Sequence, residues 1–374
     1  MLPVYLDNNA TTPVDPEVIN IMTKCLKEYY GNPSSSHHKG IAARKIIDIA
    51  RKNVADLIGA NPEEIIFTSG GTEANNMAII GTALRFKSAH IISSCIEHPS
   101  VTNPLKYLES LNFKVTYLPV NRHGIVSPDD LKKYITKKTR LITIMHSNNE
   151  TGAIQPISEI GKIARARGII FHCDAAQSVG KIPVHVNRLK TDLLTIVSHK
   201  FYGPKGIGAL YKKEGVHINP ILFGASHEMG LRPGTENLPS IAGLGRACEL
   251  AKKDMKQRVS SAKALTRLFY DELLRQIPGI KLNGHVTKRL PNTLNLSFPH
   301  VQGSLLLDRM KDEIEASTGS ACHEGKHTPS PVLKAMGLSN KEAFAAVRLS
   351  IGKNTSERQI KRAIKAIVKT YRSF

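Results

Sequence analysis

The sequence predicts an α/β fold built on a mainly parallel seven-stranded sheet, accompanied by a smaller α+β domain. Short apolar runs alternate with helical stretches between about residues 64 and 211, an alternation typical of a parallel sheet covered by helices on both faces. After Pro278-Gly279 the pattern changes to the mixed strands and helices of a two-layer unit. We therefore expect a large domain over residues 13–255, and a small domain formed by residues 1–12 and 256–374.

The predicted strands of the large sheet are apolar runs of three to five residues rich in isoleucine, leucine, valine and threonine. Such continuous runs are typical of strands that are buried on both faces. In chain order they cover residues 65–68, 91–93, 115–118, 141–145, 169–173, 193–197 and 208–211.

Helices are predicted from capping residues and from the lengths between these strands. Asp15-Pro16 is a good helix start, and Gly59 ends a helix of about residues 41–58. A long basic helix is expected over residues 241–276. In the small domain we expect strands near 293–297 and 346–350, and helices near 303–311 and 356–371.

Composition indicates a globular protein outside the membrane. The chain has 374 residues, 41% of them hydrophobic and 22% charged, and no apolar run reaches the ~18 residues of a membrane span. The first seven residues lack the basic-then-apolar order of a secretory signal, which favours a cytoplasmic location. Five cysteines without a CxxC pair favour neither structural zinc nor a disulfide framework, so no metal site is expected.

The net charge of +21 favours acidic partners, of which nucleic acid is one. The lysines and arginines are spread through helical stretches instead of forming one tail, and no RNA-binding motif is present. A basic surface that serves only solubility explains the charge equally well, and nucleic acid is the less favoured partner.

A lysine and an aspartate end two of the predicted strands. Lys200 closes Ser198-His199-Lys200 after the run 193–197, and Asp174 follows the run 169–173. In open α/β sheets the carboxyl ends of the strands form the ligand crevice, so these side chains should converge there. Alone, the lysine is a common surface residue and the aspartate a common helix cap. Together they match pyridoxal 5′-phosphate, which needs an amine to bind its aldehyde and an acid for its ring nitrogen.

Other residues complete a predicted cofactor site. The turn Gly70-Gly71-Thr72 follows the strand 65–68 and opens a helix, whose free N–H groups suit a phosphate. Ser198 and His199 lie at the same sheet edge as further phosphate donors. His98 follows the strand 91–93, where an imidazole can stack on a flat ring or carry a proton. Asn149 and Gln177 also follow strands, and their amides can bond the hydroxyl of the pyridine ring.

Motifs along essentially the whole chain resemble those of the pyridoxal-phosphate-dependent cysteine desulfurases. They are Asp7-Asn8-Asn9-Ala10-Thr11-Thr12, Thr68–Asn76, Glu97-His98, Asn148–Gly152, Asp174–Ser178, Ser198–Gly206, Arg232–Asn237, Thr318–Cys322 and Arg348–Gly352. The resemblance implies the aspartate-aminotransferase-like fold, which is fold type I of pyridoxal-phosphate enzymes, and a homodimer. It also implies removal of sulfur from L-cysteine, giving L-alanine and a persulfide for transfer to an acceptor.

The resemblance assigns roles residue by residue. The implied catalytic residues are Lys200, which binds the cofactor's aldehyde, His98, which stacks on its ring, and the nucleophile Cys322. The implied cofactor-binding residues are Gly71, Thr72, His98, Asn149, Asp174, Gln177, Ser198, His199, Lys200 and, from the other subunit, Thr235. Asn149 and Arg348 are implied to bind the substrate, with Arg348 holding its carboxylate.

Departures from the family pattern keep alternatives open. Gly71 stands where alanine is frequent, and residues 224–228 contain fewer glycines than is usual. The segment 323–331 resembles that of selenocysteine lyases, the closest alternative function. A non-enzymatic relative that binds acidic partners and another pyridoxal-phosphate lyase or aminotransferase are further alternatives. The acceptor of a persulfide would be an iron–sulfur scaffold protein or a thiolation pathway, and the Cys322 loop should be mobile to reach it.

Overall fold

The computed structural model describes residues 2–319, 321–323 and 326–374. The side chains of residues 321–323, 326 and 327 also lie outside what the structure describes. The predicted nucleophile Cys322 is therefore placed only by its backbone, in the short strand β12 (Ala321–His323).

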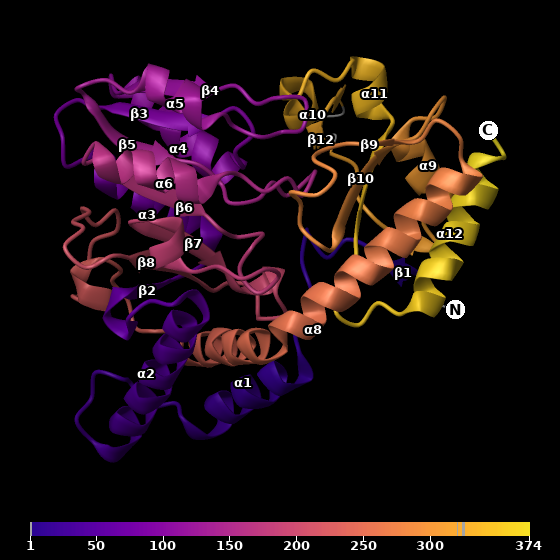
Figure 1. The fold of residues 1–374 in the computed structure, drawn as a ribbon. Coiled ribbons are helices and arrows are strands. Elements are labelled where there is room, and N and C mark those ends of the chain that lie inside the picture. The colour runs from indigo at the N-terminus through magenta and orange to yellow at the C-terminus, as the bar shows by residue number, and fades with distance from the viewer. Residues whose placement is uncertain (1, 320, 324–325) are drawn as a thin grey trace.

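A seven-stranded sheet forms the centre of the large part of the molecule (Figure 1). Its strands are β2 (Ile65–Thr68), β3 (His90–Ser94), β4 (Lys114–Leu118), β5 (Thr139–Thr143), β6 (Ile170–Asp174), β7 (Leu193–Val197) and β8 (Gly208–Lys212). They lie in the order β2-β8-β7-β6-β5-β3-β4, and β8 runs antiparallel to both of its neighbours. The predicted mainly parallel sheet is confirmed.

Some helices of this part precede the first of these strands, and the others connect successive strands of the sheet (Figure 1). They are α1 (Pro16–Glu28), α2 (His38–Ile58), α3 (Gly71–Ala83), α4 (Pro99–Ser110), α5 (Pro128–Tyr134), α6 (Ile157–Ala166) and α7 (Val186–Leu189). The Asp15 side chain caps α1 by accepting a hydrogen bond from the backbone N–H of Glu17. Gly59 ends α2 in the left-handed conformation, at φ 69°, as expected for a helix C-terminus.

The 39-residue helix α8 (Leu238–Gln276) joins the two parts of the molecule. Its first half packs on α1 and α2, and its second half runs along the small part toward α12 (Glu357–Tyr371) (Figure 1). Leu244 and Ala247 are buried in the core of the large part, whereas Phe269 and Leu273 are buried in that of the small part.

The small part is built around strand β10 (Thr293–Ser297), which pairs antiparallel with β14 (Ala346–Ser350) and with β9 (Lys281–Leu282). The N-terminal strand β1 (Val4–Tyr5) pairs in parallel with β11 (Ile314–Glu315). The remaining elements are α9 (Gly303–Arg309), β12, β13 (Lys326–Thr328), α10 (Pro331–Ala335) and α11 (Asn340–Phe344). β12 and β13 form an antiparallel pair.

The two largest apolar clusters among the described residues underlie this arrangement. One extends from Val18 to Ala251, and the other combines Val4 and Leu6 with residues between Phe269 and Val368. The N-terminal arm therefore belongs to the core of the C-terminal part. The domain bounds 13–255 and 256–374 themselves stay a prediction. Among the described residues, no helix combines the length and the apolar composition that crossing a membrane requires.

Candidate active site

A cavity of about 390 Å³ lies at the carboxyl ends of the large-sheet strands, between them, the N-terminal arm and β14. Its size falls in the usual range for small-molecule sites. Its lining residues are Asn9, Ala10, Gly71, Thr72, Asn75, His98, Ser100, Met145, Ser147, Asn149, Asp174, Ala176, Gln177, Val197, His199, Lys200 and Arg348. Most of the residues predicted to hold the cofactor are therefore brought together.

Lys200 lies in the 3-10 turn η2 (Ser198–Lys200) directly after β7. Its Nζ donates to the backbone oxygens of Asn9 at 2.9 Å and Ala10 at 2.7 Å. Burial, and then the charge of Arg348, lower the pKa of this amine to about 8, although Asp174 and Asp7 act in the opposite direction. A larger fraction of the amine is thus unprotonated near neutral pH, as a nucleophilic amine requires.

Asp174 begins a chain of side chains that reaches His98. Asn75, on the first turns of α3, donates through Nδ2 to Asp174 Oδ2 at 2.9 Å and to Ser100 Oγ at 2.8 Å. Ser100 Oγ lies 2.8 Å from His98 Nδ1. Burial lowers the pKa of His98, which favours a neutral imidazole facing the cavity.

The N-terminus of α3 forms the anion-binding end of the cavity. In the part of the chain that the structure describes, no side chain caps this helix, so the N–H groups of its first turn remain available to a phosphate. Gly70 has φ 152°, and a Cβ on Gly71 would lie 2.5 Å from Val197 Cγ2. This close approach between helix and strand explains the glycine at position 71, where the sequence departs from the family pattern.

His199 and Gln177 line the cavity together with Lys200. His199 Nδ1 lies 3.0 Å from Thr11 Oγ1, and burial, together with Lys200 and other nearby cations, lowers its pKa to about 4. Gln177 donates through Nε2 to the backbone oxygen of Asn9 at 2.9 Å.

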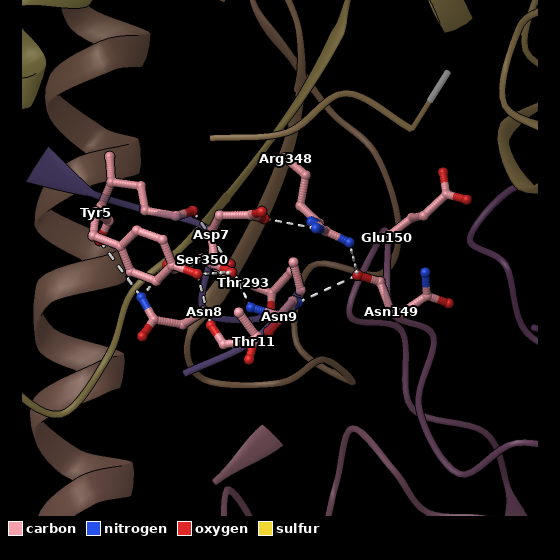
Figure 2. A network of polar contacts seen from close by, with 12 residues as sticks. Tyr5, Asp7, Asn8, Asn9, Thr11, Asn149, Glu150, Thr293, Arg348 and Ser350 are labelled. Atoms are coloured by element: carbon pink, nitrogen blue, oxygen red, sulfur yellow. Dashed lines mark hydrogen bonds and ion pairs between the residues drawn. The ribbon is translucent and has the colours of Figure 1, made fainter. Parts of the chain in front are cut away.

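Arg348 reaches the cavity from β14 and joins the two parts of the molecule (Figure 2). It donates to the backbone oxygen of Asn149 at 3.1 Å and to Asp7 Oδ1 at 2.7 Å. Among the described residues, its buried Nε finds no hydrogen-bond partner. The guanidinium is therefore held in place by groups that still leave it capacity to bind a carboxylate.

Two predicted cofactor-binding residues are not brought to this cavity. The Ser198 hydroxyl is buried without a hydrogen-bond partner, beside Gly203, and Val197 lines the cavity at that point instead. Thr235 is exposed in the loop that precedes α8. Exposure at this position agrees with the expectation that Thr235 serves the site of another subunit.

The segment that carries Cys322 is anchored at both ends near Arg348. Ser317, before it, pairs with Arg348 through backbone hydrogen bonds. After it, the Ser330 hydroxyl donates to Glu150 Oε2 at 2.5 Å. Burial raises the pKa of Glu150 to about 6, against the effects of Ser330 and Arg348. The chain therefore enters and leaves this segment close to Arg348, a residue that lines the cavity.

The residues around the cavity fit pyridoxal 5′-phosphate. The cavity combines an amine of lowered pKa, a carboxylate already fixed by an amide, an uncapped helix N-terminus and a guanidinium with an unpartnered nitrogen. These groups match the aldehyde, the ring nitrogen, the phosphate and the carboxylate of an amino acid substrate, respectively. Among the described residues, no group of histidine, cysteine or acidic side chains has a metal-binding arrangement.

Sequence reasoning did not single out Asn75, Ser100 or Asn9 as site residues. For Asn75 a signal existed, because it lies three residues after Thr72 and so shares its face of α3. Asn9 had no such signal, since its contacts with Gln177, Lys200 and Thr293 span 168 to 284 residues.

Comparisons with known proteins agree with this geometry. The sequence model of the family described as "Aminotransferase class-V" matches residues 4–363. A protein of Dictyoglomus turgidum named cysteine desulfurase IscS is 49% identical over 96% of this chain and 91% of its own. A solved NifS-like protein superimposes with a TM-score of 0.94 at 36% identity, covering 100% of both chains. A structure described as SspA in complex with cysteine gives a TM-score of 0.83 at 37% identity, over 93% of this chain and 98% of the other.

Proposed function

The chain belongs to the class-V aminotransferase family and, within it, to the cysteine desulfurases, and from this premise we propose that it removes sulfur from L-cysteine with pyridoxal 5′-phosphate as cofactor. The products are L-alanine and an enzyme persulfide on Cys322. The observation that carries the proposal is the meeting of the Lys200 amine, the Asp174 carboxylate and the Arg348 guanidinium around one cavity.

We assign the cofactor's contacts to the cavity residues. The α3 N-terminus with Gly71 and Thr72 holds the phosphate, together with His199 and the partner subunit's Thr235. Asp174 holds the proton of the ring nitrogen, and Asn75 keeps its carboxylate oriented. His98 stacks on the ring, while Gln177 and Asn149 bond ring substituents. Ser198, whose hydroxyl is buried with no hydrogen-bond partner among the described residues, stays a predicted phosphate donor.

The bound cofactor supplies an aldehyde that links to an amine and a protonated ring that accepts electrons from the substrate. Arg348 binds the carboxylate of cysteine, with Asn149 beside it. Lys200 and His98 carry protons, since both have lowered pKa values and face the cavity. The Cys322 thiolate attacks the sulfur of the substrate, the carbon–sulfur bond breaks, and the carbon gains a proton to give alanine.

The persulfide then passes to an acceptor, for which we propose a protein that assembles iron–sulfur clusters or serves thiolation. We also propose a homodimer, because Thr235 is exposed outside the cavity of its own chain. A cytoplasmic location is supported by the free thiols of Cys25, Cys95, Cys173 and Cys248, since reduced cysteines are typical of that compartment.

The direct test is to incubate the protein with pyridoxal phosphate and L-cysteine and to measure alanine and sulfide. The wild type should form both, and Lys200→Ala should form neither. Lys205→Ala removes an exposed lysine from the same loop and should leave turnover unchanged. Equal turnover by the wild type and Lys200→Ala would contradict the proposal. Repeating the assay with L-selenocysteine separates a desulfurase from a selenocysteine lyase.

A further inference from the structure

Lys181 is a second lysine beside the cavity, and the function proposed above gives it no role. Its Nζ donates to Gln177 Oε1 at 2.7 Å and to Asn9 Oδ1 at 2.9 Å. Burial of the amine, followed by the charges of Lys200 and Arg348, lowers its pKa well below the ordinary value. Burying a lysine amine costs free energy of folding. Its presence here therefore needs a reason other than a contribution to the surface charge.

The contact with Lys181 decides which way the Gln177 amide faces. The Lys181 nitrogen donates to both partners, and in Gln177 the atom that accepts from it is the amide oxygen. The amide nitrogen then lies on the other side and donates one N–H to the backbone oxygen of Asn9. Its second N–H is left for an acceptor, and Gln177 lines the cavity. With Lys181 in place, the amide therefore offers the cavity a donor.

Lys181 also fixes the support on which Lys200 rests. The backbone oxygen of Asn9 accepts from both Gln177 and Lys200. The Asn9 side chain is held through Oδ1 by Lys181 and Asn292. Through Nδ2 it donates to Thr293 Oγ1 (Figure 2). Lys181 thus connects the arm, the Gln177 amide and the Lys200 amine in one network.

We propose that Lys181 is a positioning residue, which holds the Gln177 amide with its N–H toward the ring hydroxyl of the cofactor and holds the Asn9 carbonyl that receives Lys200. The proposal rests on the proposed pyridoxal phosphate site. The competing explanation is that Lys181 only stabilises the fold of the arm.

The two explanations differ in their effect on the proton of the bound cofactor. An N–H donated to the ring oxygen stabilises its anionic form and so lowers the pH at which the cofactor loses its proton. The titratable and charged groups around this point are the side chains of Lys181, Lys200, Arg348, Asp174 and Asp7. Removing Lys181 frees the amide to rotate and so takes its N–H away from the ring oxygen, which raises that pH.

The test is the pH midpoint of the visible absorption of the enzyme with bound cofactor. Lys181→Met should raise the midpoint by about one pH unit, and Gln177→Leu should raise it similarly. In the Gln177→Leu background, Lys181→Met should add less than half of that shift, because no amide remains to be oriented. Lys353→Met is the matched control. Lys353 lines a cavity that Lys181 and Lys200 also line, yet it pairs with Asp15. The midpoint of Lys353→Met should therefore equal that of the wild type.

The outcomes separate the explanations. A Lys181→Met enzyme with a lowered melting temperature and an unmoved midpoint would overturn the proposal and leave a purely structural role. Equal shifts in both Gln177 backgrounds would also overturn it. If Lys181→Met does not fold, Lys181→Gln takes its place in the wild-type and Gln177→Leu backgrounds. The midpoint shift that it causes must again be less than half as large in the Gln177→Leu background. A wild type that shows no visible band with pyridoxal phosphate would instead refute the proposed function.

Discussion

Burial sets the charge of single side chains around the cavity. The pKa of Lys200 falls to about 8 and that of His199 to about 4, because both groups lose contact with water and face other cations. At neutral pH His199 is thus a neutral donor or acceptor. The Asp174 carboxylate accepts from the Asn75 amide and from the backbone N–H of Ala176, which fix its orientation at the cavity.

Asp174→Asn should lower the turnover of L-cysteine by about 10²-fold or more, as is usual when a transition-state partner is removed. The neutral amide cannot hold the ring nitrogen protonated, although cofactor binding should persist in part. Alanine formation measures the loss. Asp192→Asn is the control. Asp192 lies just before β7 and accepts a hydrogen bond from the backbone N–H of Phe171 in β6, so this variant should keep near-normal turnover. Wild-type activity in Asp174→Asn would show that turnover does not need Asp174 to keep the ring nitrogen of the cofactor protonated.

The position of Ser198 shows why single residues at strand ends are hard to predict. The sequence indicated that residues after 193–197 enter the crevice, and His199 and Lys200 do so. Side chains alternate between the faces of a strand, and Val197 and Thr195 are the residues that approach Gly71. The turn η2 then buries the Ser198 hydroxyl beside Gly203. A shift of one residue decides which side chain lines the cavity, and the apolar pattern alone does not reveal which residue takes that position.

At the scale of elements, Glu97 ties the end of β3 to Met145, two residues beyond the end of β5. It accepts from Ser94 Oγ at 2.5 Å and from the backbone N–H of Met145 at 3.0 Å. Burial, opposed by these two hydrogen bonds and supported by the charge of Asp174, raises its pKa to about 8. The folded protein therefore keeps a proton on Glu97 that the unfolded chain gives up near pH 4.5.

This proton makes stability depend on pH in a defined direction. The stabilisation by protonated Glu97 is complete below pH 4.5 and is lost as the pH rises toward about 8. Across that window, the unfolding free energy of the wild type should fall relative to Glu97→Gln, by on the order of 1.4 kcal/mol per pH unit. Guanidinium unfolding of both proteins at several pH values measures the difference. Parallel curves for the two proteins would show that Glu97 is ionised in the fold.

Most elements could be predicted because their signals are local. The seven strands follow from short apolar runs, and their predicted ends lie within two residues of the observed ones. Helix α2 begins at His38, three residues before its predicted start, because the His37 side chain caps it, and histidine is not among the usual capping residues. The pairing of the N-terminal arm with β11 joins residues about 310 positions apart, and local patterns carry no information on such contacts.

At the scale of the whole molecule, the site draws on distant parts of the chain. The arm, the large sheet and β14 each contribute lining residues, and the proposed dimer adds Thr235 from the partner subunit. Thr235 lies between Arg232, which pairs with Glu73 at the start of α3, and Glu236, which pairs with Arg44. These ion pairs fix the loop that would reach the neighbouring site.

Hybrid dimers test this sharing. Lys200→Ala and Thr235→Asp should each be inactive alone, the second because a carboxylate repels the cofactor's phosphate. When the two variants are co-expressed, about a quarter of the wild-type activity should return, because half of the random dimers are hybrids with one intact site. Alanine formation by the purified mixture measures it. Absence of any recovery would place Thr235 outside the site of the partner subunit.

The most direct measurement is to locate the sulfur that leaves the substrate. The enzyme with pyridoxal phosphate is given L-cysteine labelled with heavy sulfur, without an acceptor, and is then alkylated, digested and examined by mass spectrometry. We expect one labelled sulfur atom on the peptide that contains Cys322, formed together with one alanine per site, and neither label nor alanine in Cys322→Ser. Label on Cys95 or on another cysteine, or full alanine formation by Cys322→Ser, would contradict a persulfide mechanism at Cys322.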